Sequence, residues 1–357
     1  MRDRLKVFAL GLSIAALSLA SAECIYGVLL RAKGPRPEIE DIRIPPHVGG
    51  RIGPGPLWLP RKSFRFSRRI KGGKIFWDLQ CRIDEFYRRD TPGERTKPHA
   101  ERFLLLLGDS FVFGDGVGQS ETMAAYLGRE LPWARAYNYG IGGLFPGELL
   151  ERMRLIKGPP EIRESRGTVL YFFADSHIMR NMGSFTSVAG WGHGRPYYHV
   201  NPEGQIMAER YIEQARPVWT FMARLFTRSH IVRYYNLDWP VQPADSDWRF
   251  MLRLLEQIRD TTRRFGADRF YVVFYPGNAR MSRAFIPYLE KADIPYIDIS
   301  HWDMNRLIQG PAFIPGKGHP TAQTHRLLAG ALAKVLREDR LTPSGWKHPR
   351  RLISTPP

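Results

Sequence analysis

The sequence predicts an α/β fold in which a mostly parallel sheet lies between two layers of helices. Two observations support this: short apolar segments of strand length alternate with longer segments of helical periodicity, and several apolar segments end in glycine or polar residues. Such alternation is typical of a parallel sheet that helices cover on both faces. With 357 residues, of which 43% are hydrophobic, the chain can bury a sizeable core. We therefore expect a three-layer α/β/α sandwich.

The predicted core begins at Arg102. Residues 103–107 form an unbroken apolar run that ends at Gly108, as expected of a strand buried on both faces. Further strands are predicted over residues 136–139, 168–173, 270–275 and 295–299. Helices are predicted over residues 121–131 and 147–157, around residues 251–258, where apolar residues follow i, i+3, i+4, i+7 spacing, and from Pro320 onward.

The N-terminus carries a targeting signal. Basic residues at positions 2, 4 and 6 precede an apolar run over residues 7–30, which Glu23 interrupts. Ala20-Ser21-Ala22 resembles the cleavage site of a secretory signal. Alternatively, the run is long enough to cross a bilayer as an uncleaved anchor, and we favour this interpretation because Glu23 lies off-centre. Either alternative exports the rest of the chain, to the extracytoplasmic side of the membrane or into the medium.

The formal net charge of the chain is +18, and the basic residues are spread along the whole sequence. We interpret them as an arginine-rich surface and expect no nucleic-acid partner, because no zinc-finger spacing or RNA-binding aromatic motif is present. Of the two cysteines, Cys24 lies in the apolar run and leaves Cys81 for the folded part. We expect no cofactor and no metal site.

The expected organisation has four parts. Residues 1–30 form the signal or anchor, residues 31–98 a linker or collar, residues 99–340 the α/β domain, and residues 341–357 a C-terminal tail. An insertion over about 177–245 follows the third predicted strand.

Because ligands of open α/β sheets bind beyond the carboxyl ends of the strands, we expect this insertion to form one wall of the substrate cleft. Its aromatic residues, among them Trp191, Tyr197 and Tyr198, would stack on sugar rings. Core packing is the commoner use of such side chains.

Three segments are expected to bring polar or glycine residues to the carboxyl edge of the sheet. Gly108-Asp109-Ser110-Phe111 follows the first strand, where an exposed serine would lie beside backbone N–H groups. Residues 138–143 include glycines that allow a backbone donor to approach a reacting oxygen. Gly318-His319-Pro320 precedes the last helix and offers a general base, whereas His325 lies further along that helix.

Taken in this order, these segments resemble the blocks of the SGNH/GDSL hydrolase superfamily. The resemblance covers about residues 100–340 and implies a flavodoxin-like fold, with Ser110 as nucleophile, His319 as base and the N–H of Gly143 in the oxyanion hole. Residues 108–114, with the apolar N-terminus, look like the exported, membrane-anchored bacterial branch. The resemblance implies an ester hydrolase or acyl (acetyl) transferase that acts on esters of envelope lipids or polysaccharides.

Two positions depart from the family pattern. Ala174 stands where the third block has an asparagine that donates to the oxyanion, a loss that typically costs on the order of a hundred- to thousand-fold in rate. Lys317 and Gly316 stand where the last block has an aspartate before the histidine. Asp298 and Asp303 are the candidates for a substitute acid. The departures keep a second interpretation open: an inert domain that binds or scaffolds envelope polysaccharide.

Overall fold

We describe a computed structural model of the chain. It describes residues 2–34, 39–44, 49–51, 58–60, 63–71, 73–94, 97, 99–156, 161–277, 279–314, 318–340 and 351–352. These residues form two compact units. The larger unit comprises residues 39–182, 198–209 and 244–357, and the smaller one residues 1–38, 183–197 and 210–243.

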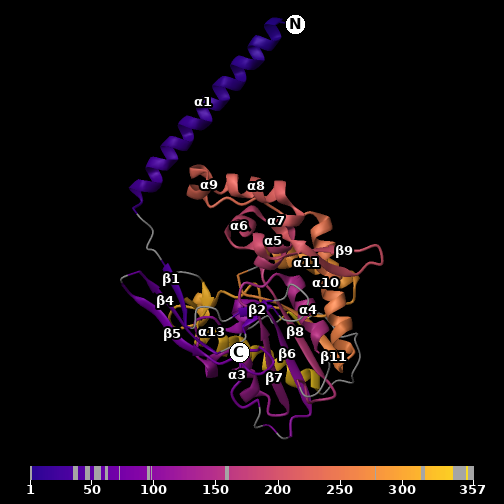
Figure 1. Cartoon of the computed structure of the whole chain (residues 1–357). Helices are drawn as coiled ribbons and strands as arrows, with labels where there is room; N and C mark the ends of the chain where they lie inside the picture. Colours follow the sequence, from indigo (N-terminus) through magenta and orange to yellow (C-terminus); the bar gives the residue numbers. More distant parts are fainter. Residues whose placement is uncertain are drawn as a thin grey trace. The chain divides into compact units, whose positions relative to one another are not determined.

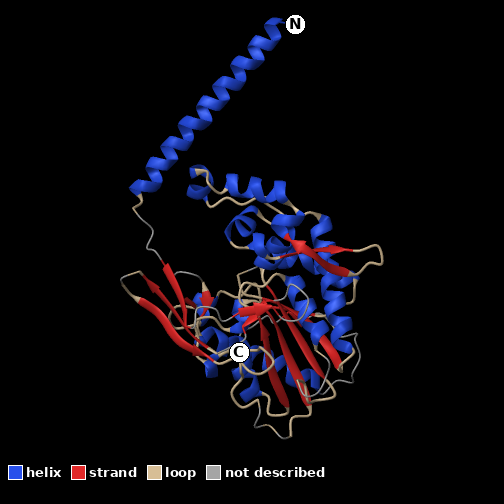
Figure 2. Cartoon of the chain, viewed as in Figure 1, coloured by secondary structure: helices blue, strands red, loops and turns tan. Residues whose placement is uncertain are grey.

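The larger unit is built on a six-stranded sheet in the order β15-β12-β11-β8-β6-β7, shown in Figures 1 and 2. All its strand pairs are parallel. Its strands are β6 (Arg102–Gly108), β7 (Ala134–Gly140), β8 (Gly167–Phe173), β11 (Ala267–Phe274), β12 (Tyr296–Asp298) and β15 (Arg351–Leu352). The predicted strands are therefore present, and the fold is the expected α/β/α sandwich.

Helices cover both faces of this sheet because successive strand residues point to opposite sides. Phe103, Leu105 and Leu107 of β6 belong to one core, and Leu104 and Leu106 belong to the other. The first core is completed by α4 (Pro146–Leu155), α5 (Asp175–Met182), α10 (Asp245–Arg263) and α11 (Ala279–Lys291). The second is completed by α3 (Met123–Glu130), α12 (Met304–Leu307) and α13 (Ala322–Arg340).

The segment that we expected to be a linker or collar contains a sheet of its own. Strands β1 (Ile39–Ile44), β4 (Phe64–Ile70) and β5 (Ile75–Cys81) pair antiparallel in the order β1-β4-β5, and β2 (Gly49–Arg51) pairs with β3 (Trp58–Pro60). The inward side chains of β4 and β5 alternate and form a third core with Phe113. Alternation over seven residues was too weak in the sequence to predict the whole sheet.

The expected insertion is divided between the two units. Residues 198–209 stay with the larger unit and form a hairpin of β9 (Pro196–Val200) and β10 (Ile206–Tyr211) around the predicted turn. Tyr198 packs in the core, where a Cβ at Gly147 would lie 2.4 Å from its ring, so this tyrosine fills space. That the insertion lines the substrate cleft stays a prediction. In the expected C-terminal tail, residues 351–352 pair with β12.

The smaller unit is helical. It contains α1 (Arg2–Ala32), α6 (Phe185–Gly190), α7 (Ile212–Ala215), α8 (Pro217–Phe226) and α9 (His230–Tyr235). Within α1, residues 8–32 are long and apolar enough to cross a membrane. The side-chain hydrogen bonds that join α1 to α9 and to Ser229 before it involve Glu23 and Tyr26, which both follow the possible cleavage site.

Candidate functional site

Ser110 begins the short helix α2 (Ser110–Phe113) directly beyond the end of β6. Asp109 caps this helix, and its Oδ1 accepts a hydrogen bond from Phe111 N at 3.0 Å. Gly108 is required here because a Cβ would lie 2.5 Å from the Val112 side chain. As the first residue of a helix, Ser110 keeps a backbone N–H that the helix does not use. The serine is therefore held at the carboxyl edge of the sheet, beside a backbone donor.

His319 lies against this serine. Its Nε2 is 3.0 Å from Ser110 Oγ, although 209 residues separate the two in the sequence. The imidazole packs between two aromatic rings, with Phe111 at 5.5 Å and Trp77 at 6.2 Å between ring centroids, both edge-on. His319 is 8% exposed. The structure thus brings the two residues that sequence analysis singled out within hydrogen-bond distance of each other.

The glycine segment after β7 reaches the same edge. Gly140 is required where β7 meets α2, because a Cβ there would lie 2.1 Å from Phe113 N. Gly143 has a φ of +69°, which glycine adopts without strain. Its N–H makes no hydrogen bond within the described part of the chain. That N–H suits the predicted oxyanion role, which the geometry alone does not test.

Ala174 stands at the position where the third block of the family pattern has an asparagine. Ala174 follows β8, is 7% exposed and offers no side-chain donor. Asp175 begins α5, and burial raises the pKa of its carboxyl to about 6, against the opposing effect of Arg280. The oxyanion donor that the family pattern has at position 174 is therefore missing.

The structure brings neither expected substitute acid to His319. Asp298 Oδ1 accepts a hydrogen bond from Ser300 N at 2.9 Å. Asp303 caps α12 by accepting from Asn305 N at 3.2 Å and pairs with Arg306. Short local hydrogen bonds hold each of these two aspartates in its own turn. Lys317 and Gly316 lie outside the described residues.

The carboxylate found beside His319 belongs to Asp115, which sequence analysis did not consider. Asp115 Oδ2 lies 3.9 Å from His319 Nε2, on the ring edge that also faces Ser110. The same oxygen would lie 3.7 Å from a Cβ at Gly142, so the carboxyl sits between the histidine and the glycine segment. Burial raises the pKa of Asp115, while His319 and the arginines Arg43, Arg89 and Arg68 oppose that rise.

Comparison with solved structures gives matches of the same fold type. The chain is similar to a lipolytic protein of the G-D-S-L family from Veillonella parvula, at 12% identity over 67% of this chain and 100% of that one, with a TM-score of 0.38. A protein of the G-D-S-L family from Desulfitobacterium hafniense is 12% identical over 65% of this chain and 98% of that one, with a TM-score of 0.36. The SGNH-hydrolase family esterase AlinE4 is 17% identical over 68% of this chain and 98% of that one, with a TM-score of 0.31.

No family model matches the sequence, and a search of curated proteins finds no match. At these identities and TM-scores the solved structures carry no argument about activity. What the chain can do must therefore be argued from its own residues.

A buried polar network lies beneath Ser110. Asp109 Oδ2 is 3.5 Å from both His177 Nε2 and Arg180 Nη1, and Arg180 donates to Leu144 O at 2.7 Å. Burial acts to raise the pKa of Asp109, but His177 and Arg180 outweigh it and hold the pKa of that carboxyl below its usual range. Burial lowers the pKa of His177. The network ties the serine loop to the loops after β7 and β8, which carry the other site positions.

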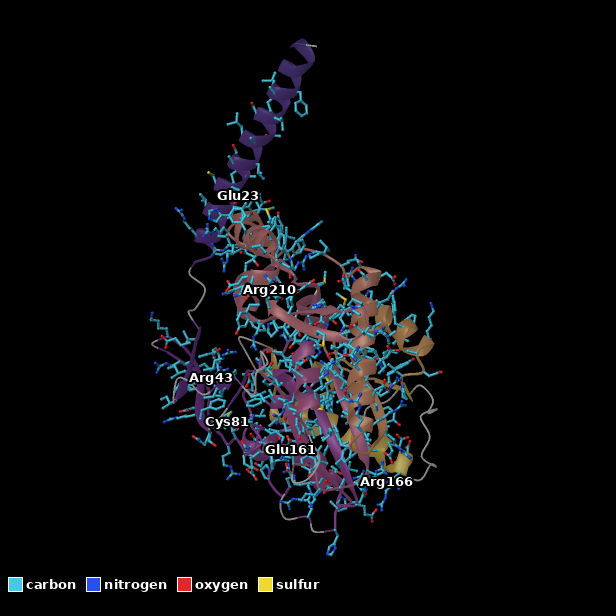
Figure 3. All side chains as sticks on the ribbon, turned by 45° about the vertical axis from the view of Figure 1, so that its right-hand side comes forward. Glu23, Arg43, Cys81, Glu161, Arg166 and Arg210 are labelled. Carbon is cyan, nitrogen blue, oxygen red and sulfur yellow. The ribbon has the colours of Figure 1, made fainter. Side chains whose placement is uncertain are left out.

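A second set of hydrogen bonds, made by Arg89, holds the loop that contains Asp115. The buried guanidinium of Arg89 donates to the carbonyl oxygens of Phe113, Gly114 and Val117. The sheet formed by β1, β4 and β5 adds Trp77 and, through Arg68 and Arg43, positive charge near Asp115. Figure 3 labels Arg43 and Cys81 on this sheet. The expected collar therefore contributes directly to the site.

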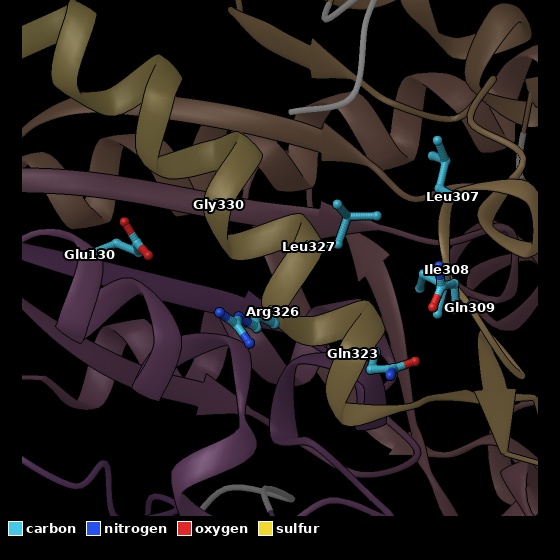
Figure 4. A pocket seen from close by; sticks show the side chains of 8 residues that line it. All are labelled: Glu130, Leu307, Ile308, Gln309, Gln323, Arg326, Leu327 and Gly330. Carbon is cyan, nitrogen blue, oxygen red and sulfur yellow. The ribbon is translucent and has the colours of Figure 1, made fainter.

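One cavity of about 360 Å³, shown in Figure 4, lies between α13 and the segment after α12. Glu130, Arg326 and Leu327 are among its lining residues, and Ser110, Asp115 and His319 are not. His325 is fully buried inside α13, so it packs, and burial lowers its pKa to about 3. Neither feature belongs to the site. Among the described residues, no group of histidine, cysteine and acidic side chains has the geometry of a metal site.

The residues of the candidate site that sequence analysis missed are Asp115, Arg89 and Trp77. Asp115 stands in Gly114-Asp115-Gly116, directly after the segment that carries Ser110. Its position five residues after the serine was the available signal, since one turn of helix returns the chain toward Ser110. Trp77 and Arg89 gave no signal, because they reach the site from a sheet and a loop outside the motif region.

Proposed function

We propose that this protein is a serine-dependent ester hydrolase or acyltransferase of SGNH type. The observation that carries the proposal is the 3.0 Å separation of Ser110 Oγ and His319 Nε2 at the carboxyl edge of a parallel sheet. A serine paired in this way with an imidazole is an activated nucleophile. The glycine segment with Gly143 beside it supplies backbone donors for an oxyanion.

The proposed reaction has two steps. Ser110 Oγ attacks the ester carbonyl carbon while its proton passes to His319 Nε2, and the resulting oxyanion accepts hydrogen bonds from the N–H groups of Ser110 and Gly143. The carbon–oxygen bond to the leaving alcohol then breaks, and His319 returns the proton to that alcohol. Water, or an acceptor hydroxyl in a transferase, attacks the acyl-enzyme by the same path in reverse.

Asp115 is proposed to stabilise the protonated His319. Its Oδ2 lies 3.9 Å from Nε2, where a negative charge favours the imidazolium. In a Ser-His-Asp triad the acid contacts the other ring nitrogen and also orients the ring. Here Asp115 supplies charge from the Nε2 side, and packing against Phe111 and Trp77 orients the ring.

We propose that the substrate is an acylated lipid or polysaccharide of the cell envelope and that the α/β unit lies on the extracytoplasmic side. The support is the membrane-length helix α1 behind a basic N-terminus, together with the family resemblance of residues 108–114. A C-terminal reporter fusion should be active outside the cytoplasm. Reporter activity restricted to the cytoplasm would refute the location.

A second function is favoured by one specific observation, the absence of a donor side chain at Ala174. A domain that keeps the fold and lacks catalysis would bind acylated polysaccharide without cleaving it. The two functions share a ligand class and differ in turnover, so one assay separates them.

The assay uses the full chain in detergent with a small acetyl ester and compares wild type, Ser110→Ala and Lys317→Asp. The esterase proposal expects measurable hydrolysis by wild type and its loss in Ser110→Ala. Equal rates for these two proteins would remove the nucleophile and favour the binding function. A large gain in Lys317→Asp would show that the missing acid of the last block limits the rate.

A further inference from the structure

The smaller unit exposes an apolar helix face. Val218, Phe221, Met222 and Leu225 of α8 are exposed by 74%, 65%, 45% and 54%. Their spacing places them on one side of the helix, while Thr220 and Ala223 on the opposite side are buried. We call these four side chains the α8 apolar face. A face of this size is unusual on the water-exposed surface of a soluble protein.

Neighbouring residues extend this apolar surface. Phe185 packs edge-on against Trp219 and Phe226 of α8, at 4.7 and 5.3 Å between ring centroids, and its N donates to Trp239 O at 2.7 Å. Trp239 is 49% exposed, and Val241 beyond it is 62% exposed. Phe185 thus joins α8 to the segment after α9, and both present apolar side chains outward.

The same unit contains the membrane-length helix, and the two helices are linked closely. Glu23 of α1 accepts hydrogen bonds from Ser229 Oγ and, at 2.6 Å, from His230 N at the start of α9. The Tyr26 and Tyr235 hydroxyls are 2.6 Å apart. Because Ser229 follows Leu225 by only four residues, α8 ends within a few residues of the point where α1 packs onto α9.

The segment that carries the apolar face has an excess of arginine. Residues 210–243 contain five arginines, at positions 210, 216, 224, 228 and 233, against Glu213 and Asp238. A cavity of about 850 Å³ between α1 and α9 is lined by Arg31, Lys33 and Arg233 among others. An amphipathic helix with apolar side chains on one face and arginines at its borders is the pattern of a helix that lies in a membrane interface.

We propose that α8 lies in the interface of the bilayer that α1 crosses, with the α8 apolar face at the acyl boundary and the flanking arginines at anionic lipid headgroups. The occupant of the face is thus the lipid surface. The apolar length of α1, its packing onto α9 and the arginine excess all favour this occupant over a protein partner. This inference rests on the proposed membrane location of α1 and does not depend on the proposed enzymatic activity. It implies that two points, α1 and α8, fix the smaller unit against the membrane.

The test places an environment-sensitive fluorophore on single cysteines of the full chain, reconstituted in vesicles of phosphatidylethanolamine and phosphatidylglycerol. Exposed Cys24 is changed to serine, and buried Cys81 is kept. The label is attached to Phe221→Cys. The control is Met207→Cys, in the hairpin of the larger unit, where the apolar side chain is also exposed, by 41% against 65% for Phe221.

The proposal expects blue-shifted emission at position 221 and quenching by acyl-chain spin labels at least severalfold stronger than at position 207. Adding Val218→Ser and Leu225→Ser should reduce the quenching at position 221. If the label at position 221 emits as it does in water and is quenched no more strongly than the label at position 207, the proposal is overturned and the α8 apolar face belongs to another partner. A misfolded chain is recognised by far-ultraviolet circular dichroism, in which the spectrum of each labelled variant should match that of the wild-type protein.

Discussion

Asp115 lies on the same edge of the His319 imidazole as Ser110, with Oδ2 3.9 Å from Nε2, while Ser110 Oγ lies 3.0 Å from that nitrogen. The serine and the acid therefore both lie on the Nε2 side of the imidazole, whereas in a Ser-His-Asp triad they lie at opposite nitrogens of the ring. An acid in this position can stabilise the positive charge on the imidazole but cannot fix its tautomer through Nδ1. This arrangement leads to predictions that differ from those of a Ser-His-Asp triad.

Asp115→Asn should lower kcat by about tenfold, much less than the roughly ten-thousand-fold loss that removal of a triad acid can cause. Asp115→Ala should lower kcat to a similar degree, because both variants lose the charge. Steady-state hydrolysis of an acetyl ester measures this. An Asp115→Asn variant with full activity would show that the carboxyl acts as a neutral hydrogen-bonding group, and would contradict the proposed charge stabilisation.

The pH dependence should follow the titration of Asp115. Burial raises its pKa, and His319, Arg43, Arg89 and Arg68 act in the opposite direction, so the carboxyl still takes up its proton at a higher pH than an exposed aspartate. Activity should therefore fall as the pH drops through this raised pKa, and Asp115→Asn should flatten that part of the profile. If the pH–rate profiles of wild type and Asp115→Asn fall identically on the acid side, a group other than Asp115 causes that fall.

The same shift predicts a change in stability. A carboxyl whose folded pKa is raised contributes stability below its unfolded pKa, and that contribution is lost as the pH rises through the folded value. At neutral pH the charged Asp115 thus destabilises the fold, and Asp115→Asn should raise Tm by about 2–4 °C while it lowers activity. Thermal melts at pH 7 and pH 4 check this, because the gain should shrink at pH 4. A lower Tm at pH 7 would contradict it.

The network beneath Ser110 should be essential for folding. Arg180→Met leaves Asp109 as a buried carboxylate that has lost a charged partner, which typically costs about 3–5 kcal/mol of unfolding free energy. Arg249→Met is the matched control, because its pair with Asp245 is exposed by 73% and 55%, and solvent screens exposed pairs so that they contribute little to stability. Denaturant titrations compare the two. Similar losses in both variants would show that the network is no more important than a surface ion pair.

Ala174→Asn should increase kcat, by about ten- to a hundredfold, because it restores a side-chain donor at the end of β8 where an oxyanion would lie. Ala174→Val is the matched control, since it adds volume without a donor and should not increase the rate. The comparison is made on the same acetyl ester. A gain in both variants would attribute the effect to packing.

The sheet and its covering helices could be predicted because burial on both faces leaves uninterrupted apolar runs, such as residues 103–107. Ser110 and His319 could be predicted because the carboxyl ends of parallel strands meet at one edge. Local hydrogen bonds hold Asp298 and Asp303 in their own turns, so neither is the carboxylate found beside His319. That carboxylate, Asp115, was missed because its approach to His319 depends on the Arg89 contacts. The small sheet with Trp77 could not be predicted as a whole, because the weak alternation over residues 63–98 indicates a strand or two at most.

The central claim is that Ser110 is a nucleophile activated by His319. The most direct measurement treats the full chain with a serine-directed phosphonate probe and locates the adduct by peptide mass spectrometry. The account predicts a single phosphonylated site at Ser110, no adduct in Ser110→Ala, and labelling at least a hundredfold slower in His319→Ala with the fold intact by circular dichroism. A wild-type protein that binds the probe nowhere, or labels at Ser110 equally fast without His319, would contradict it.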